Sequence, residues 1–486
     1  MDPMESKLDE VTAAFRRRLT SAVSNMRSSR DPEGFCEAER VLVELAQELA
    51  SDVTQMVVDE LSRDQARRRE ALDEVRRRAE ARGIEMRVER DRSTEFQTLG
   101  GKTVTVTTPY ATARPRGETP HETRGTQGTG VYTVLDMLGI AGRSTPALRL
   151  RVGHAVSEAN SVSAARELLA EGGILVDHKA ALRHTYRVAD DALRGRAEAI
   201  RTTTSSALEG PLVGRRVVAA VDGGRVNIRR RVAGRPKKGG RKHFVTEWRE
   251  PKVVTIYVVG ADGKRDRTIP SVIDGTLGDA DAVFELLTYH LLRLGAGGAT
   301  ELVLVGDAAP WIWTRGQALR ERLGLPPERF IEIIDYFHVV ERLSEVAKGH
   351  AKWTDAERAE WLKLQKEKLK AGEIEAVETA IRRLYKRGSK ELKTEVDYWE
   401  RNRERLRYGG WRARGIPIGS GAVESSVRRV INLRMKGASV TWLEEHAEGV
   451  LHLRAFAKSG RWGELERTAL ANCRWRPTAR GAKRAG

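Results

Sequence analysis

The sequence predicts an α/β protein. A mixed five-stranded sheet is covered by helices and interrupted by an all-α insertion, and a mainly α-helical N-terminal region precedes it. Before about residue 210, apolar residues recur mostly at helical spacing. From residue 213, short runs rich in Val and Ile replace that pattern and then alternate with helical segments. The 486 residues, 40% of them hydrophobic, suffice for about two to four domains with a sizeable core.

Residues 1–95 are predicted to be a helical N-terminal region. Leu42, Leu45 and Leu49 follow one another at helical spacing, and residues 63–82 are rich in Arg and Glu with a thin apolar seam. Such a segment is usually a solvated helix or a short coiled coil. Dimerisation and DNA contact are the functional alternatives.

Residues 96–130 are predicted to be a β-hairpin followed by a linker. Apolar residues alternate on both sides of Gly100 and Gly101, which is a hairpin pattern. Residues 111–130 are rich in Thr, Gly, Arg and Pro and have no period, so they are expected to form a loop.

Residues 131–210 are predicted to be helical and to contain a helix-turn-helix. Two short helical segments, Ser163–Ala170 and Leu175–Arg187, flank a turn with two glycines. In a DNA-reading motif the second helix enters the major groove, which makes Lys179 and Arg183 candidate DNA-binding residues. An ordinary helical hairpin explains the pattern equally well.

Residues 213–350 are predicted to form the first part of a catalytic core. Their elements follow the order β-β-β-α-β-α-β-α, which is the order of the RNase H-like fold. Residues 351–415 are charged and helical and form the all-α insertion, and residues 416–460 complete the core with two helices. Residues 461–486 are predicted to be a basic C-terminal tail. The predicted strands are Val217–Val221 (with Val226–Ile228 as a candidate extension), Phe244–Val259, Ile269–Ile273, Leu302–Val305 and Phe330–Ile334.

Three carboxylates are the candidate catalytic and metal-binding residues. Asp222 ends the first predicted strand, Asp307 ends the fourth, and Glu424 opens the helix after the insertion. In the predicted strand order the first and fourth strands are neighbours, so the two aspartates would lie side by side. Like charges that close repel unless cations lie between them, and three hard oxygen ligands suit two Mg²⁺ or Mn²⁺ ions for phosphoryl transfer. Taken singly, the aspartates are also common turn residues and the glutamate a common helix-start residue.

Four segments of the chain resemble the DDE transposases of bacterial insertion sequences, most closely the Kra-type family, which is related to the Mutator-like group. The resemblance runs from about Val131 to Arg454 and is specific from Asp222 onward. The segments are Val221–Val226 (VDGGRV), Gly306–Trp313 (GDAAPWIW), Ile333–Leu343 (IIDYFHVVERL) and Gly419–Arg429 (GSGAVESSVRR).

The resemblance implies that Asp222, Asp307 and Glu424 are the DDE triad of a mobile-element transposase. This enzyme would cleave DNA at the ends of its insertion sequence and transfer the strands to target DNA. Asp335 and His338 would be an Asp-x-x-His element beside the site, although a helix cap and a core histidine explain them as well. Family members often have a cysteine-rich, zinc-ribbon-like element where this chain has none, so no zinc is expected.

Three further residues are candidates for contact with DNA or with the site. Trp311 could stack on an unpaired base, but core packing is the more common role of a tryptophan. Arg428 lies one helical turn after Glu424, where it would contact phosphates or simply face solvent. Lys436 resembles a family lysine and is expected to contact phosphate.

The net charge of +18 indicates a polyanionic partner. Most of the excess lies in residues 225–243, which hold nine Lys and Arg, and residues 474–486, which hold five; neither stretch has an acid. No apolar run is long enough to span a membrane, and two distant cysteines exclude a disulfide framework and fit a reducing compartment. The expected DNA-binding residues of the first stretch are Arg229, Arg230, Arg231, Lys237, Lys238, Arg241 and Lys242.

The expected partner is therefore double-stranded DNA, namely terminal inverted repeats and target DNA, with no membrane. The protein would act in the bacterial cytoplasm at the nucleoid, as a dimer or higher homo-oligomer in the DNA complex. A catalytically silent or domesticated DNA-binding regulator is the alternative, because a basic surface and a helix-turn-helix would suffice for it.

Overall fold

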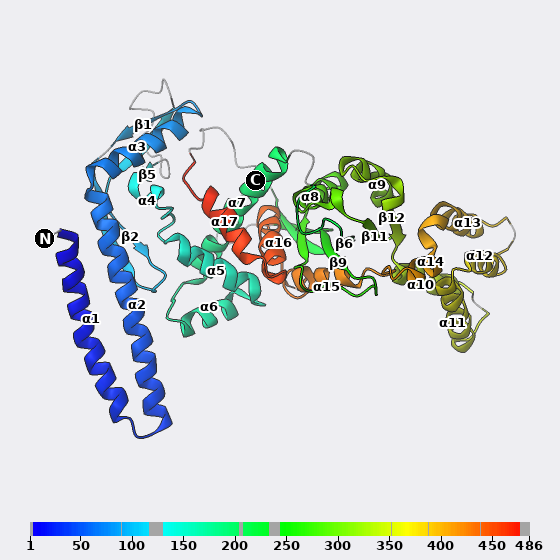
Figure 1. Cartoon of the computed structure of the whole chain (residues 1–486), viewed down its shortest axis with the longest axis horizontal. Coiled ribbons are helices and arrows are strands. Elements are labelled where there is room, and N and C mark those ends of the chain that lie inside the picture. Colours follow the sequence, from blue (N-terminus) through cyan, green and yellow to red (C-terminus); the bar gives the residue numbers. More distant parts are fainter. Residues whose placement is uncertain are drawn as a thin grey trace. The chain divides into compact units, whose positions relative to one another are not determined.

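The computed structural model describes residues 3–88, 90–115, 130–203, 208–232, 244–350, 352–386, 388–437 and 439–476 (Figure 1). The chain divides into two compact units. The N-terminal unit comprises Met1–Gly195 with Gly463–Gly486, and the sheet unit comprises Arg196–Trp462. No helix in the described ranges combines the length and the apolar character that crossing a bilayer requires. The two units are described separately.

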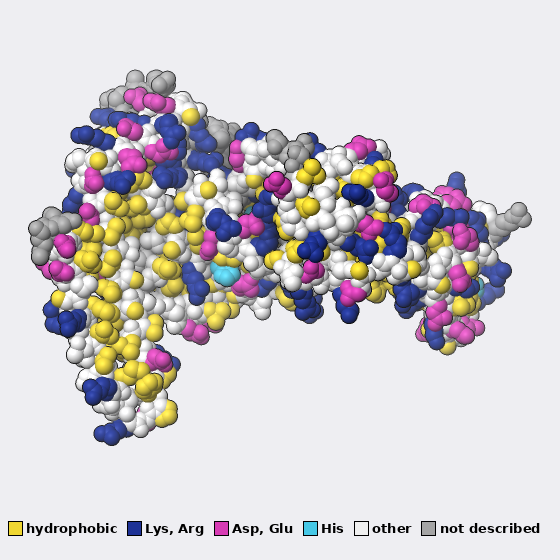
Figure 2. Space-filling model, viewed as in Figure 1, with side chains coloured by type: hydrophobic (Ala, Val, Ile, Leu, Met, Phe, Trp, Pro, Cys, Tyr) yellow, Lys and Arg dark blue, Asp and Glu magenta, His cyan; other side chains and the backbone are white. Residues whose placement is uncertain are grey.

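The N-terminal unit begins with three helices, α1 (Pro3–Ser28), α2 (Pro32–Arg63) and α3 (Gln65–Glu80). Helix α1 packs along α2, and apolar side chains follow both helices on the face drawn in Figure 2. The Asp64 carboxylate accepts a hydrogen bond from the Ala66 N–H at 2.8 Å, which caps α3 where α2 ends. The prediction of helix as far as residue 95 is wrong after Glu80, because a strand follows.

Two small β-sheets follow these helices. The predicted hairpin is confirmed as β2 (Arg92–Gln97) and β3 (Thr103–Thr108), which pair antiparallel. A second sheet has the order β1-β4-β5. Its strand β4 lies in part of the predicted linker, because it pairs with a distant strand that local sequence patterns do not reveal. The strands of this sheet are β1 (Ile84–Val88), β4 (Tyr110–Pro115) and β5 (Gly130–Tyr132).

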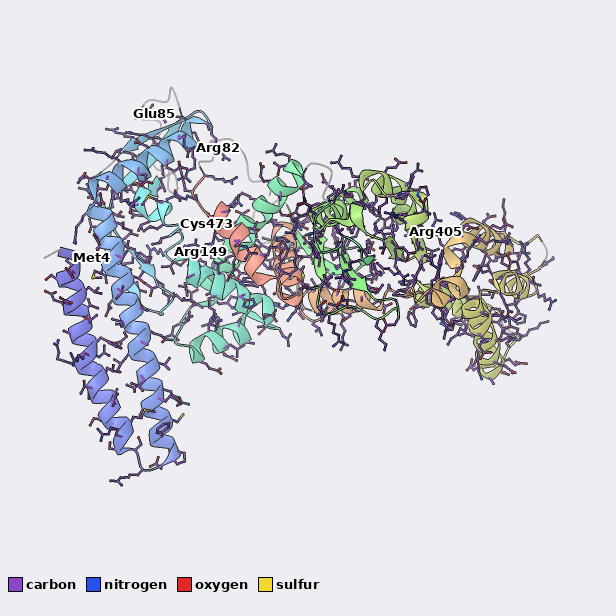
Figure 3. All side chains as sticks on the ribbon, in the orientation of Figure 1. Met4, Arg82, Glu85, Arg149, Arg405 and Cys473 are labelled. Carbon is purple, nitrogen blue, oxygen red and sulfur yellow. The ribbon has the colours of Figure 1, made fainter. Side chains whose placement is uncertain are left out.

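Helices α5, α6 and α7 share one hydrophobic core, in which Leu148, Leu169 and Ala181 are buried. The predicted turn lies between α6 and α7, and Gly173 in it has φ +75°, which favours glycine. Helix α7 is longer than the predicted second helix. The buried Arg149, labelled in Figure 3, donates to the carbonyls of Gly139 and Ser144, both at 2.7 Å. The helices of this region are α4 (Thr133–Met137), α5 (Pro146–Glu158), α6 (Val162–Glu171) and α7 (His178–Thr202).

The sheet unit contains the predicted mixed five-stranded sheet, with the order β10-β9-β6-β11-β12. Strand β6 is antiparallel to β9 and parallel to β11; β9 and β10 are antiparallel, and β11 and β12 are parallel. Its core residues are fully buried runs of Val, Ala, Leu and Ile, as expected where helices cover a sheet. The strands are β6 (Arg216–Gly223), β9 (Lys252–Val259), β10 (Val272–Thr276), β11 (Glu301–Gly306) and β12 (Phe330–Ile334).

A two-stranded ribbon, β7 (Val226–Arg231) with β8 (Phe244–Arg249), stands outside this sheet between β6 and β9. The predictions that Val226–Ile228 extends the first strand and that Phe244–Val259 is one strand are therefore wrong. Pro251 explains the break, because it has no N–H for the ladder and restricts the preceding residue. The third strand, β10, also begins three residues later than predicted.

Helices cover the sheet and form the insertion (Figure 1). Helix α16 packs on β10, and α8 packs on β9 and β10. Residues 352–386 and 388–415 of the insertion hold helices and no strand, as predicted, whereas α17 occupies part of the predicted tail. These elements are α8 (Ala280–Arg293), η1 (Ala296–Gly298), α9 (Pro310–Arg322), η2 (Pro327–Arg329), α10 (Tyr336–Lys348), α11 (Asp355–Ala371), α12 (Ile374–Arg382), α13 (Lys390–Asn402), η3 (Arg403–Leu406), α14 (Tyr408–Ala413), α15 (Gly421–Val427), η4 (Arg428–Asn432), α16 (Glu444–Lys458) and α17 (Trp462–Asn472).

Candidate active site

Asp222 and Asp307 lie at the same edge of the five-stranded sheet. Strands β6 and β11 are parallel, with Ala220 opposite Val305, so both chains reach this edge together. Asp222 is the second-last residue of β6, and Asp307 directly follows β11. The buried apolar residues of both strands end at this edge. Asp222 and Asp307 come directly after them and are partly exposed.

Both aspartates are held by backbone N–H groups of the residues that follow them. The Gly223 N–H donates to Asp222 Oδ1 at 2.7 Å, and the Ala309 N–H donates to Asp307 Oδ1 at 2.9 Å. The second bond turns the chain into α9, which Pro310 begins. Each contact fixes one carboxylate oxygen.

Glu424 lies on helix α15, which packs against β6 and β9. The Thr255 hydroxyl of β9 donates to the Ser426 hydroxyl of α15 at 2.9 Å, and both side chains are buried. Glu424 itself is exposed and accepts a hydrogen bond from the Ser420 hydroxyl at 3.2 Å. At Gly224 a Cβ would stand 2.6 Å from Ile431 Cδ1, so the chain after β6 runs close to this helical segment.

Burial raises the pKa of Asp222 from 3.8 to about 6. The Gly223 N–H and the charge of His338 oppose this rise, whereas the charges of Asp307 and Glu424 add to it. All three predicted carboxylates thus interact electrostatically. A bound cation would relieve the electrostatic repulsion that Asp307 and Glu424 exert on Asp222.

Asp335 joins this site to the glycine-punctuated stretch before Glu424. It is fully buried and caps α10, with the Phe337 N–H donating to Oδ1 at 2.7 Å. Its other oxygen accepts from the Ser420 N–H at 3.0 Å and from the Ser420 hydroxyl. Burial is the main cause that raises the pKa of Asp335, and Glu424 adds to it. His338 is half-buried, and its Nδ1 lies 3.4 Å from Glu341 Oε2.

One buried arginine beside the site was not predicted. The segment η4, which follows the glutamate helix, is a π-helix, and such segments are frequent at functional sites. Arg454 of α16 is fully buried and donates to the carbonyls of Val430 (2.7 Å) and Arg429 (2.5 Å). It therefore supports the backbone just after Glu424. No local pattern in the sequence distinguishes it from a solvated helix arginine.

Trp311 is half-buried and packs against neighbouring side chains. Its ring meets the Phe284 ring edge-on at 6.1 Å, and Lys252 Nζ lies 5.5 Å from its centroid. The other two candidates near Glu424 are Arg428 and Lys436, and both are exposed.

The predicted DNA-binding residues are divided between the units. Arg229 and Arg230 are exposed on β7, and Arg230 pairs with Glu247 at 2.7 Å. Lys179 and Arg183 are exposed one turn apart on α7, in the N-terminal unit. The Arg231 side chain and residues Lys237, Lys238, Arg241 and Lys242 lie outside the described residues.

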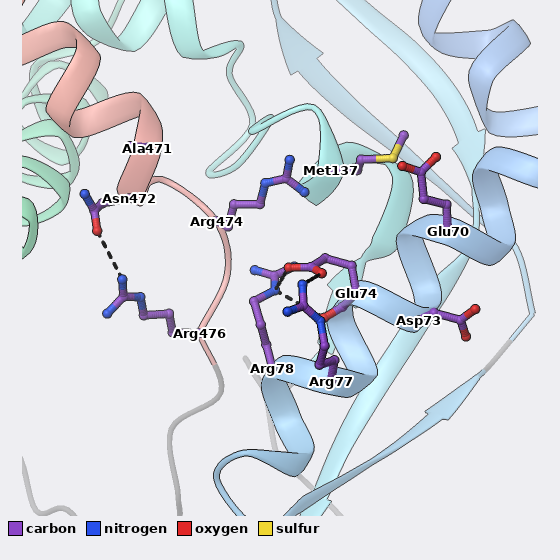
Figure 4. A pocket seen from close by; sticks show the side chains of 10 residues that line it. All are labelled: Glu70, Asp73, Glu74, Arg77, Arg78, Met137, Ala471, Asn472, Arg474 and Arg476. Atoms are coloured by element: carbon purple, nitrogen blue, oxygen red, sulfur yellow. Dashed lines mark hydrogen bonds and ion pairs between the residues drawn. The ribbon is translucent and has the colours of Figure 1, made fainter.

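A cavity of about 740 Å³ lies in the N-terminal unit, where the end of the chain meets α3 (Figure 4). Arg78 pairs with Asp136 and donates to the Trp475 carbonyl at 2.7 Å, and Glu74 pairs with Arg77. These contacts tie the returning C-terminal segment to α3. These ion pairs and hydrogen bonds give the charged residues around the cavity a structural role.

Within the described ranges, the structure contains no group of three or more His, Cys, Asp or Glu that is already placed to hold a metal ion. The donor chemistry at the sheet edge nevertheless fits a hard divalent cation, since it consists of carboxylate oxygens. Comparison of the chain with family models, with curated proteins and with solved structures found no match in any of the three.

Proposed function

We propose that the protein is a DDE transposase with an RNase H-like catalytic core. Support comes from the strand order β10-β9-β6-β11-β12, in which β9 runs antiparallel to the other four strands. The proposal rests chiefly on the placement of Asp222, Asp307 and Glu424 on two parallel strands and a helix packed beside them; the charges of Asp307 and Glu424 also act on Asp222. A protein that only bound DNA would gain little from three carboxylates that interact with one another near a phosphate backbone.

Asp222, Asp307 and Glu424 would hold two Mg²⁺ or Mn²⁺ ions. When bound, such ions activate the attacking oxygen and stabilise the leaving oxygen of a phosphoryl transfer. Glu424 is exposed and makes a single described hydrogen bond, to Ser420, so its carboxylate is able to turn toward the aspartates. Water and then the freed 3′-hydroxyl serve as nucleophiles, and no covalent protein intermediate is required.

The other residues of the chain position this chemistry. Asp335 fixes Ser420 and with it the start of the glutamate helix, and Arg454 fixes the backbone just after that helix. The exposed Arg229 of the ribbon and the exposed Lys179 and Arg183 of α7 supply phosphate contacts, and α7 reads the terminal inverted repeats. The protein works on DNA at the bacterial nucleoid as a homo-oligomer.

The test is cleavage of duplex DNA that contains the inverted repeats flanking the gene, in the presence of Mg²⁺. We expect Asp222→Asn, Asp307→Asn and Glu424→Gln each to bind this DNA like wild type and to lose cleavage by more than about 100-fold. Glu445→Gln is the matched control, because Glu445 is an exposed glutamate in the first turn of a nearby helix, α16. Wild-type cleavage by the triad variants would refute the triad. Binding without any cleavage by the wild type would favour a silent DNA-binding regulator.

A further inference from the structure

A second cavity opens beside Asp222. It has a volume of about 650 Å³, and Gly223 and Gly224 form part of its wall. Strand β8 of the ribbon contributes Trp248, and the segment after the π-helix contributes Lys436. The size suits one nucleotide, because small-molecule pockets are typically about 300–1,000 Å³.

Trp248 is the unusual feature of this cavity. Its side chain is 55% exposed, whereas Trp311, the tryptophan that the sequence had suggested for stacking, is packed against Phe284. Exposure of an indole ring to water is energetically unfavourable, and exposed aromatic side chains are typical of a binding surface. The strand that bears it is short and paired on one side only, with Asn227 opposite Trp248.

Three cationic side chains line the same cavity as Trp248. Arg225 and Lys436 are exposed, and neither makes an ion pair with a carboxylate within the described ranges. Arg249 also lines the cavity, but Glu444 Oε1 lies 3.3 Å from its Nη1 and neutralises part of its charge. Glu250 is the one acid that lines the cavity within the described residues, so three positive charges face one negative charge.

The two walls of the cavity are joined by backbone hydrogen bonds. The Trp442 N–H donates to the Asn227 carbonyl at 2.9 Å, and the Arg229 N–H donates to the Trp442 carbonyl at 2.8 Å. The buried Trp442 ring donates from Nε1 to the Met435 carbonyl at 3.1 Å, which holds the residue before Lys436. The ribbon and the lysine are therefore fixed relative to each other, as a preformed binding site requires.

We propose that this cavity binds one unpaired nucleotide of DNA, with the base stacked on Trp248 and the phosphate held by Arg225 and Lys436. An aromatic face accepts any base, and the two cations suit a backbone phosphate. The inference rests on the proposed function, since it places an unpaired nucleotide next to the carboxylates that would cut its strand. It adds a DNA subsite to that function.

The test is a binding comparison in EDTA, where no cleavage occurs. The probes are a fluorescein-labelled duplex with a short unpaired overhang and the same duplex with blunt ends. Wild type should prefer the overhang, and Trp248→Ala should reduce that preference about 5- to 150-fold, which is the range expected for the loss of one stacked base. Trp248→Phe should retain most of it, because a ring remains. Phe244→Ala is the control: Phe244 is 51% exposed on the same ribbon but does not line the cavity.

The phosphate contact has its own readout, the salt dependence of overhang binding. Lys436→Ala should lower the magnitude of the slope of log K against log salt by about 0.7. Lys264→Ala should leave it unchanged, because Lys264, whose side chain is 86% exposed, follows the opposite end of β9. Equal binding of both probes by wild type, or no effect of Trp248→Ala, would refute the subsite and leave the proposed function standing. Failure to bind any DNA would refute both.

Discussion

Replacing Asp222 by Asn should stabilise the protein in the absence of divalent cations. The carboxylate is partly buried near Asp307 and Glu424, and its pKa in the folded protein is about 6, against 3.8 in the unfolded chain. The unfolded chain therefore loses its proton at lower pH than the folded protein does. Between pH 4 and pH 6 the folded state binds more protons, so stability falls as pH rises. Asn removes this cost and keeps an oxygen to accept the Gly223 N–H.

The size of the effect follows from the pKa difference of about two units. At about 1.4 kcal/mol per unit, the ionised Asp222 costs roughly 3 kcal/mol at pH 7.5, and about half of that at pH 5. A change of that size corresponds to an increase in Tm of about 6 °C or more for a unit of a few hundred residues.

Thermal unfolding in EDTA, measured at several pH values between 5 and 7.5, tests this. The control is Asp262→Asn: Asp262 has a side chain that is 58% exposed and accepts the Lys264 N–H at 3.0 Å. The control should change stability by less than about 0.5 kcal/mol at any pH. If Asp222→Asn is no more stable than wild type at pH 7.5, or if its advantage does not grow with pH, the pKa of Asp222 is not raised by burial as inferred.

Three further predictions concern other parts of the chain. Changing all four Lys and Arg of residues 237–242 to Ala should reduce the magnitude of the salt slope of DNA binding by up to about 3.6, with little change in sequence preference; an unchanged slope would show that they do not contact DNA. Arg454→Met should lower the urea midpoint, because each stranded carbonyl, such as that of Val430, costs about 1–3 kcal/mol; an unaltered midpoint would contradict this. Leu169→Ala should cost about 2–5 kcal/mol by urea unfolding, whereas Leu168→Ala, at a residue 60% exposed, should cost under about 0.5; equal costs would refute the shared core of α5–α7.

The five-stranded sheet was predictable because its strands are buried on both faces. Val217–Val221 and Leu302–Val305 are continuous apolar runs, and a single sequence is enough to recognise them. The sequence does not reveal the β7–β8 ribbon, because Ile228 is buried by contacts outside the sheet and only Pro251 marks the break between β8 and β9. Similarly, β4 depends on pairing with the distant strand β1.

The candidate site divides in the same way. The positions of Asp222 and Asp307 followed from where their strands end, and that of Glu424 from the helix after the insertion. No local sequence pattern identifies Trp248 or Arg454, because tertiary packing determines that Trp248 is exposed and that Arg454 is buried. Sequence therefore indicates groups at the ends of strands and helices better than it indicates the residues around them.

The central claim, that Asp222, Asp307 and Glu424 share divalent cations, is tested most directly by counting Mn²⁺ ions bound to the protein–DNA complex by electron paramagnetic resonance. We expect about two tightly bound ions per chain in wild type, as in two-metal phosphoryl transfer. Each of Asp222→Asn, Asp307→Asn and Glu424→Gln should lose at least one ion, and Glu445→Gln should lose none. Equal Mn²⁺ binding by wild type and the three variants would contradict the claim.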